Sequence, residues 1–161
     1  EHANGIVGTG VADTINAGAG DDVIDSAGGA DIVFAGGGDD VMTFADLNFK
    51  TIDGGYGTDT ILISQLALDF TDTILMNKID KIEVIDLTGN GGQTLVINEE
   101  TVRTITEKSY LAILGEAADT VTRQTITGSW TPSGTTSFAG KACNVFIHSD
   151  GVTILVIDQG I

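Results

Sequence analysis

A nine-residue period governs the first third of the chain. Four consecutive units fill residues 8–43, and they read GTGVADTIN, AGAGDDVID, SAGGADIVF and AGGGDDVMT. The sixth position of every unit is Asp, the eighth is a large apolar residue, and small residues, mostly Gly, fill the first four. A fifth copy occupies residues 54–62, and a partial copy with Asn4 at its sixth position precedes the first. An acid and an apolar residue recurring in phase predict a repeat architecture rather than an acidic linker.

A period of nine does not match an α-helix, whose apolar stripe recurs every three or four residues. It fits a six-residue turn followed by a three-residue strand, so that two consecutive units close one coil of a flattened solenoid. We expect successive coils to stack at the spacing of neighbouring strands, ~4.8 Å. Asp13 then lies over Asp31 on one edge, and Asn4, Asp22 and Asp40 stack on the opposite edge. The eighth-position side chains point inward between two layers of strands.

Carboxylates stacked at that distance repel one another unless a cation lies between them. Calcium takes roughly six to eight oxygen ligands and accepts backbone carbonyls as readily as carboxylates. Gly provides such carbonyls because it adopts positive φ at little cost and allows close approach. Ordering nine residues costs ~9–18 kcal/mol in backbone entropy, whereas one buried aliphatic side chain contributes only ~2–3 kcal/mol. The repeat is therefore expected to be largely unfolded without metal and to fold on binding calcium.

The units resemble the RTX nonapeptide repeat, a calcium-binding motif, over residues 8–43 and 54–62. The resemblance implies a parallel β-roll with calcium between loops that lie two units apart, bound by sixth-position side chains and by carbonyls of positions one to four. It pairs loop 8–13 with 26–31 and loop 17–22 with 35–40, and it adds Asn4 with Asp22 and Asp40 with Asp59. We expect roughly three to five Ca²⁺ ions. The candidate metal ligands are Asn4, Gly8, Gly10, Asp13, Ala17, Gly18, Ala19, Gly20, Asp22, Ser26, Ala27, Gly28, Gly29, Asp31, Ala35, Gly36, Gly37, Gly38, Asp40, Asp53, Gly55, Gly57 and Asp59.

The first unit departs most from the pattern. Val11 stands at its fourth position and Thr9 at its second, and Ser26 and Ala27 replace glycines in the third unit. Because a β-branched residue resists positive φ, the first loop is expected to bind calcium weakly or to adopt a different geometry.

The unit that follows residue 43 lacks the sixth-position acid. That position falls on Phe49, so loop 26–31 is expected to have no further stacking partner. Asp46 or Asp53 can substitute as a ligand, and we prefer Asp53, which directly precedes a Gly-Gly pair.

Two further acids, Asp21 and Asp39, hold fifth positions. We expect them to be solvated charges or outer-sphere groups. The best-formed site is then the one between loops 17–22 and 35–40.

After residue 62 the composition shifts to short runs rich in Ile, Leu, Val and Thr, which predict β-strands. These runs are ILIS, TILM, KIEVIDL, QTLVIN, YLAILG, TVTRQTI, NVFIHS and GVTILVID. Asp150-Gly151 predicts a tight hairpin, Gly89–Gly92 another turn, and Glu99–Thr106, opened by Asn98, the one short helix. The expected fold is all-β, with a parallel β-roll over residues 3–62 and a β-rich cap over residues 63–161.

Charge and motifs exclude several classes of function. With 7 basic against 23 acidic residues the net charge is −16, which argues against binding nucleic acid or anionic membranes. Cys143 is the only cysteine, so it has no disulfide partner, and with two histidines there is no zinc-type cluster. No H-E-x-x-H, G-x-S-x-G or Walker motif occurs, so we expect no enzyme. Trp130, on an expected loop, is more plausible as a packing anchor than as a carbohydrate platform.

A second resemblance lies in the C-terminal part of the chain. IEVIDLTGNGGQTLVIN at 82–98 and YLAILGEAADTV at 110–121 resemble the C-terminal region of very large RTX adhesins that Gram-negative bacteria export by type I secretion. The final VTILVIDQGI is similar to the apolar tail beside their uncleaved export signal. This implies a secreted or cell-surface adhesin or biofilm-type protein, with the type I apparatus and an unidentified surface ligand as partners, and it places the chain near the C-terminus of a longer polypeptide.

Two alternatives remain open at this point. One is a module that binds peptide or glycan directly through loops around Trp130. The other is the accessory C-terminal domain of a secreted metalloprotease, lipase or polysaccharide epimerase.

Overall fold

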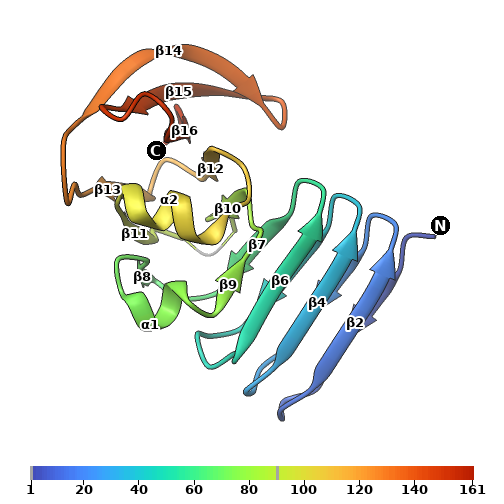
Figure 1. Cartoon of the computed structure of the whole chain (residues 1–161). Helices are drawn as coiled ribbons and strands as arrows, with labels where there is room; N and C mark the ends of the chain where they lie inside the picture. Colours follow the sequence, from blue (N-terminus) through green and yellow to red (C-terminus); the bar gives the residue numbers. More distant parts are fainter. Residues whose placement is uncertain (1, 90) are drawn as a thin grey trace.

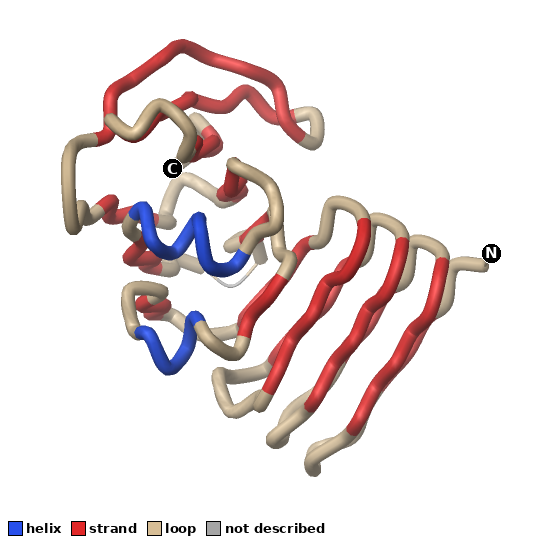
Figure 2. Tube along the Cα trace, viewed as in Figure 1, coloured by secondary structure: helices blue, strands red, loops and turns tan. Residues whose placement is uncertain are grey.

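The computed structural model describes residues 2–89 and 91–161. Within them the chain forms sixteen strands and two short helices, so the expected all-β class is confirmed (Figures 1 and 2). No helix in these ranges is long and apolar enough to cross a membrane.

Through the repeats the chain alternates between two parallel sheets. One sheet begins with the short strands β1 (Gly5–Val7), β3 (Val23–Asp25), β5 (Val41–Phe44) and β7 (Thr60–Ile63). The other consists of β2 (Thr14–Ala19), β4 (Ile32–Gly37), β6 (Thr51–Tyr56) and β9 (Ile79–Asp80), with β2, β4 and β6 side by side in Figure 1. Ile15 pairs with Val33, and Ile24 pairs with Met42. Each residue thus pairs with the one at the same position two units later, which is the parallel pairing expected for a β-roll.

The eighth-position side chains form the core between the two sheets. They are almost fully buried and belong to one hydrophobic cluster, as predicted: Ile15, Ile24, Val33, Met42 and Ile61. Within the repeats, the three-residue strands are β1 and β3, whereas β2, β4 and β6 are longer because they continue through the first positions of the following loop.

One extra residue enters the coil in the interrupted segment. Val33 pairs with Ile52, one position beyond the two-unit spacing, so the residue beside Asp31 is Lys50 and not Phe49. The predicted position of Phe49 is therefore wrong by one residue. Phe49 turns inward instead, 1% exposed, with its ring centroid 5.1 Å from that of Phe44. Burial of this aromatic pair explains the longer coil.

The sheet that contains β7 continues without a break into the C-terminal part. Its order is β1-β3-β5-β7-β10-β12-β16-β15-β14, and its later strands are β10 (Val84–Asp86), β12 (Tyr110–Leu114), β14 (Trp130–Phe138), β15 (Lys141–His148) and β16 (Ile154–Asp158). A third, parallel sheet contains β8 (Ala67–Asp69), β11 (Thr94–Ile97) and β13 (Thr120–Arg123). The main hydrophobic cluster also spans both parts. The division at residues 62 and 63 therefore marks a change of composition within one continuous sheet and core.

The expectation of at most one helix is wrong. The run TILM forms α1 (Thr73–Met76), because the Asp72 side chain caps its first turn by accepting from the Ile74 N–H at 2.8 Å. Leu75 and Met76 are buried by the helix. The predicted helix is present as α2 (Glu99–Ile105), capped by Asn98.

The hairpin at Asp150-Gly151 is confirmed, since β15 and β16 pair antiparallel and Gly151 has φ +74°, but residues 149–153 join the strands, so the connection is longer than the predicted tight turn. Trp130 is not on a loop but opens β14, which forms the edge of the large sheet. Pro132 is tolerated there because an edge strand needs fewer backbone donors and the register shifts between Pro132 and Gly134. The turn predicted at Gly89–Gly92 includes residue 90, which lies outside the described residues.

Two adjacent glycines test the stacking of the coils. Gly36 has φ +116°, and a Cβ there would lie 1.9 Å from the carbonyl oxygen of Gly18 in the previous coil. Gly37 has no atom within 4 Å of such a Cβ. We expect Gly36→Ala to cost at least about 2 kcal/mol, because strain at positive φ alone costs ~1–2 kcal/mol, whereas Gly37→Ala should stay within about 1 kcal/mol of the wild type. Denaturant unfolding in calcium measures both, and equal losses would contradict the observed stacking.

Candidate metal centre

Sixth-position side chains form a continuous ladder along one edge of the coils. Asp22 Oδ1 accepts the Asn4 N–H at 2.6 Å, Asp40 Oδ1 accepts the Asp22 N–H at 2.7 Å, and Asp59 Oδ1 accepts the Asp40 N–H at 2.9 Å. The ladder ends at Glu83, whose Oε2 accepts the Asp59 N–H at 3.0 Å. The stacking expected for this edge is therefore present, and it extends one acid further than the repeats. We call these five residues, Asn4, Asp22, Asp40, Asp59 and Glu83, the carboxylate column.

Each aspartate of the carboxylate column uses only one oxygen in the ladder. The Oδ2 atoms of Asp22, Asp40 and Asp59 are buried and have no hydrogen-bond partner. The three side chains are at most 1% exposed. A buried charged oxygen without a partner is costly, because it has lost water and gained nothing in return. Three such oxygens in successive coils fit a row of bound cations, and hard oxygen donors fit calcium.

Burial also changes the acidity of these groups. The pKa of Asp59 is raised to about 7, chiefly by burial and also by the neighbouring charges of Asp40 and Glu83, against the backbone hydrogen bond from Asp40. Burial likewise raises the pKa of Asp40. Without a cation, the charged states of Asp40 and Asp59 are therefore disfavoured.

Glycine loops bring carbonyl oxygens to the same edge. Positive φ occurs at the second loop position in Gly18, Gly36 and Gly55 and at the fourth in Gly20, Gly38 and Gly57. A Cβ on Gly38 would lie 2.4 Å from the Gly20 oxygen, and one on Gly57 would lie 2.0 Å from the Gly38 oxygen. The carbonyls of one loop thus lie directly against the next loop, which only glycine permits. The remaining predicted ligands of these loops, Ala17, Ala19, Ala35 and Gly37, lie in β2 and β4 and present backbone oxygens only.

No three Asp, Glu, His or Cys side chains of residues 2–89 and 91–161 gather at one point. This agrees with the stacking, because each coil contributes one carboxylate to an edge. Backbone carbonyls must supply most ligands of any ion bound there.

The opposite edge is less regular. Asp31 Oδ1 accepts the Asp13 N–H at 2.9 Å, so the predicted stacking is present. However, Asp13 Oδ2 accepts from the N–H and hydroxyl of Thr9 at 2.7 and 2.8 Å, and these bonds lower the pKa of Asp13. Neither Thr9 nor Val11 has positive φ, which confirms the different geometry predicted for the first loop. The carboxylate of Asp13 is therefore turned onto its own loop.

The second loop on this edge, residues 26–31, has the glycine-like backbone. Ala27 and Gly29 have φ +63° and +124°, and the buried hydroxyl of Ser26 has no partner. Gly8 lies against the Ser26 carbonyl, whereas a Cβ on Gly10 or Gly28 would meet no atom closer than 3.8 Å.

The preferred substitute ligand, Asp53, is not brought to either edge. It pairs in register with Phe34 and accepts from Lys81 Nζ at 3.0 and 3.1 Å, so it is engaged in an ion pair. Asp53 stays away from both edges because it lies at the end of a unit and not at its sixth position.

The fifth-position acids form a separate exposed row, in which Asp21 accepts from the Asp39 N–H and Asp39 from the Thr58 N–H.

Glu83 is the member of the carboxylate column that the repeat pattern missed. It lies well beyond the two-unit spacing from Asp59 and has no glycine loop before it. A local signal was present, because EVID at 83–86 repeats the DVID of 22–25 in the same phase.

Trp130 behaves as a packing residue. Its indole N–H donates to the Gln124 carbonyl at 3.2 Å, and its ring lies edge-on to His148 at 5.3 Å. His148 is buried at the end of β15, and Cys143 is a buried free thiol.

The calcium-free chain should gain strand structure on mild acidification. The pKa of Asp59 is about 7 in the folded chain and ~3.9 in an unfolded one, so only the folded chain is protonated there between these values. The stability that this protonation contributes to the folded chain is fully present below pH ~4 and is lost as the pH rises towards 7. Circular dichroism of the calcium-stripped chain at pH 5 and pH 8 measures this, with Asp59→Asn expected to reduce the difference. More strand at pH 8 would contradict the raised pKa.

Comparison with known families agrees with the geometry of the loops. Residues 7–42 match the family described as RTX calcium-binding nonapeptide repeat, in 4 copies. Comparisons with curated proteins and with solved structures found no match. The matched segment contains Asp13, Asp22, Asp31 and Asp40 with the loops that precede them. Residues 7–42 of this chain are therefore a run of RTX calcium-binding nonapeptide repeats.

Proposed function

We propose that this chain is a non-enzymatic module that folds into a parallel β-roll on binding calcium. The observation that carries the proposal is the row of buried, unpartnered Oδ2 atoms of Asp22, Asp40 and Asp59 between stacked glycine loops. Ions between loops 17–22 and 35–40, and between 35–40 and 54–59, would satisfy these oxygens. The carboxylates are then ligands, which leaves them no role as acid and base catalysts.

Further ions belong to positions that lack part of the ligand set. Asn4 offers an amide instead of a carboxylate above Asp22, and on the opposite edge Asp13 is bonded to Thr9. We propose that the pairs Asn4 with Asp22 and loop 8–13 with 26–31 bind calcium more weakly than the two central sites. The total remains within roughly three to five ions.

Folding is coupled to calcium because the folded state alone creates the sites. At submicromolar calcium the stacked, buried carboxylates oppose folding. At 100 times the dissociation constant, each site stabilises the folded state by about 2.7 kcal/mol. The charged groups of the column thus change from a cost to a source of stability as calcium rises.

This dependence suits a protein that crosses a secretion channel unfolded and folds outside. RTX repeats are typical of extracellular or secreted proteins. We propose that the chain is the C-terminal module of a large adhesin exported by the type I route, which is supported by the sequence resemblance of residues 82–121. An accessory domain of a secreted hydrolase or epimerase would use the same calcium step. Direct ligand binding at Trp130 is less favoured, because its indole N–H donates to the Gln124 carbonyl and its ring packs against His148.

The calcium requirement is tested by circular dichroism of the full chain at neutral pH. In excess chelator we expect the strand signal of the repeats to be largely lost, because buried carboxylate charges are uncompensated. Adding millimolar calcium should restore it, and magnesium should not, since Mg²⁺ prefers a smaller octahedral site. A chain that is fully folded in excess chelator would refute the proposed function.

The register of the ligands is tested by two neighbouring substitutions. Asp22→Ala removes a buried oxygen of the carboxylate column, so the calcium concentration at half-folding should rise by at least about tenfold. Asp21→Ala removes an exposed acid of equal charge one residue away, and a shift of about twofold is expected. Calcium titration of both variants provides the comparison. Equal shifts would show that charge alone, and not the column, determines affinity.

A further inference from the structure

The carboxylate column ends where the glycine loops end. Val84 pairs with Thr60 in the sheet, and this register places Glu83 beside Asp59 as the next sixth-position residue. In the following strand the corresponding position is Leu111, whose side chain is buried and apolar. We call the space between two successive members of the column a step, and the last step therefore lies between loop 54–59 and Glu83.

A lysine side chain reaches into this last step. Lys108 Nζ donates to the Gly57 carbonyl and, at 3.0 Å, to the Thr58 hydroxyl, and it lies 3.7 Å from Glu83 Oε2. Gly57 and Thr58 are the fourth and fifth residues of the last repeat. One ammonium thus contacts a loop carbonyl, a loop hydroxyl and a column carboxylate.

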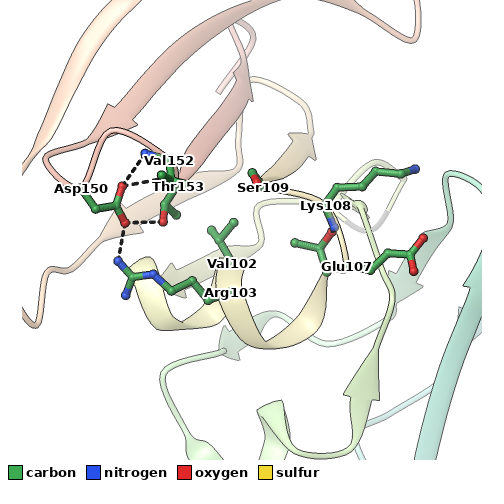
Figure 3. A pocket seen from close by; sticks show the side chains of 9 residues that line it. Val102, Arg103, Glu107, Lys108, Ser109, Asp150, Val152 and Thr153 are labelled. Carbon is green, nitrogen blue, oxygen red and sulfur yellow. Dashed lines mark hydrogen bonds and ion pairs between the residues drawn. The ribbon is translucent and has the colours of Figure 1, made fainter.

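The position of this ammonium is fixed by its surroundings. The Lys108 N–H donates to Thr106 Oγ1 at 3.0 Å, and this hydroxyl donates to Glu83 Oε1 at 2.9 Å. In Figure 3 the Lys108 side chain extends away from the bonded cluster of Arg103, Asp150 and Thr153, although all four border the same pocket. Lys108 is therefore held by the column and not by that pocket.

We propose that the ammonium of Lys108 takes the place of a calcium ion at the last step of the carboxylate column. An ammonium is a compact cation whose three N–H donors suit carbonyl, hydroxyl and carboxylate oxygens, the same kinds of atom that calcium selects. Because Lys108 is part of the chain, its charge is present at every calcium concentration. The charge of Glu83, at the junction between the last coil and the cap, is then compensated without metal, and the column binds one ion fewer than its acids would allow.

This inference rests on the proposed calcium-binding function and is tested by counting ions. Native mass spectrometry of the calcium-loaded full chain gives the number of Ca²⁺ ions bound. We expect Lys108→Ala to bind one ion more than the wild type, because its removal exposes the Gly57, Thr58 and Glu83 oxygens to a metal. The matched control is Lys81→Ala, which should keep the wild-type count. Lys81 is paired with Asp53 and not with the column, and its side chain is 34% exposed against 31% for Lys108.

A charge-preserving variant covers the case in which Lys108→Ala does not fold. Lys108→Arg keeps a cation at the position and should fold in calcium with the wild-type ion count. The proposal is overturned if Lys108→Ala folds with the wild-type count, or if Lys108→Arg gains an ion or fails to fold. A wild-type chain that binds no calcium would instead refute the proposed function, and that result is obtained before any variant is compared.

Discussion

Like charges held at strand spacing are the constraint on which this structure depends. Asp22, Asp40 and Asp59 cannot move apart, because the Oδ1 atom of each accepts a backbone N–H from the neighbouring coil. The backbone register that pairs the inward apolar residues therefore also fixes the separation of the carboxylates. The same backbone geometry therefore determines both the packing of the core and the spacing of the candidate metal ligands.

The period of the repeats contains enough information to predict this geometry. A nine-residue unit with an acid at position six and an apolar residue at position eight specifies the pairing of alternate units, the buried side chains and the stacked acids. It also predicts the different geometry of the first loop, since the steric reason lies in Val11 itself. These features could be predicted because each depends on residues within one coil of its neighbour.

Features that depend on distant packing could not be predicted from the period. The extra residue before β6 exists because Phe49 is buried against Phe44, and this shift places Lys50 beside Asp31. Glu83 joins the column from beyond the last repeat because β10 pairs with β7, and the nine-residue period does not predict this pairing. The run at 73–76 forms a helix because Asp72 caps it, although its composition is typical of a strand. In each case a tertiary contact or a cap decided between conformations that the local sequence allowed.

Both rows of sixth-position acids end beside a lysine, and the two lysines are placed differently. On the edge of Asp13 and Asp31, the next position belongs to Lys50, which is exposed, although Asp31 itself is only 1% exposed. On the edge of the carboxylate column, Glu83 is fully buried beneath the cap and water is excluded. A buried anion at the end of a stack needs a cation that cannot leave. Lys108 meets this need because its backbone belongs to the cap, whose strands continue the sheet and the hydrophobic core of the coils.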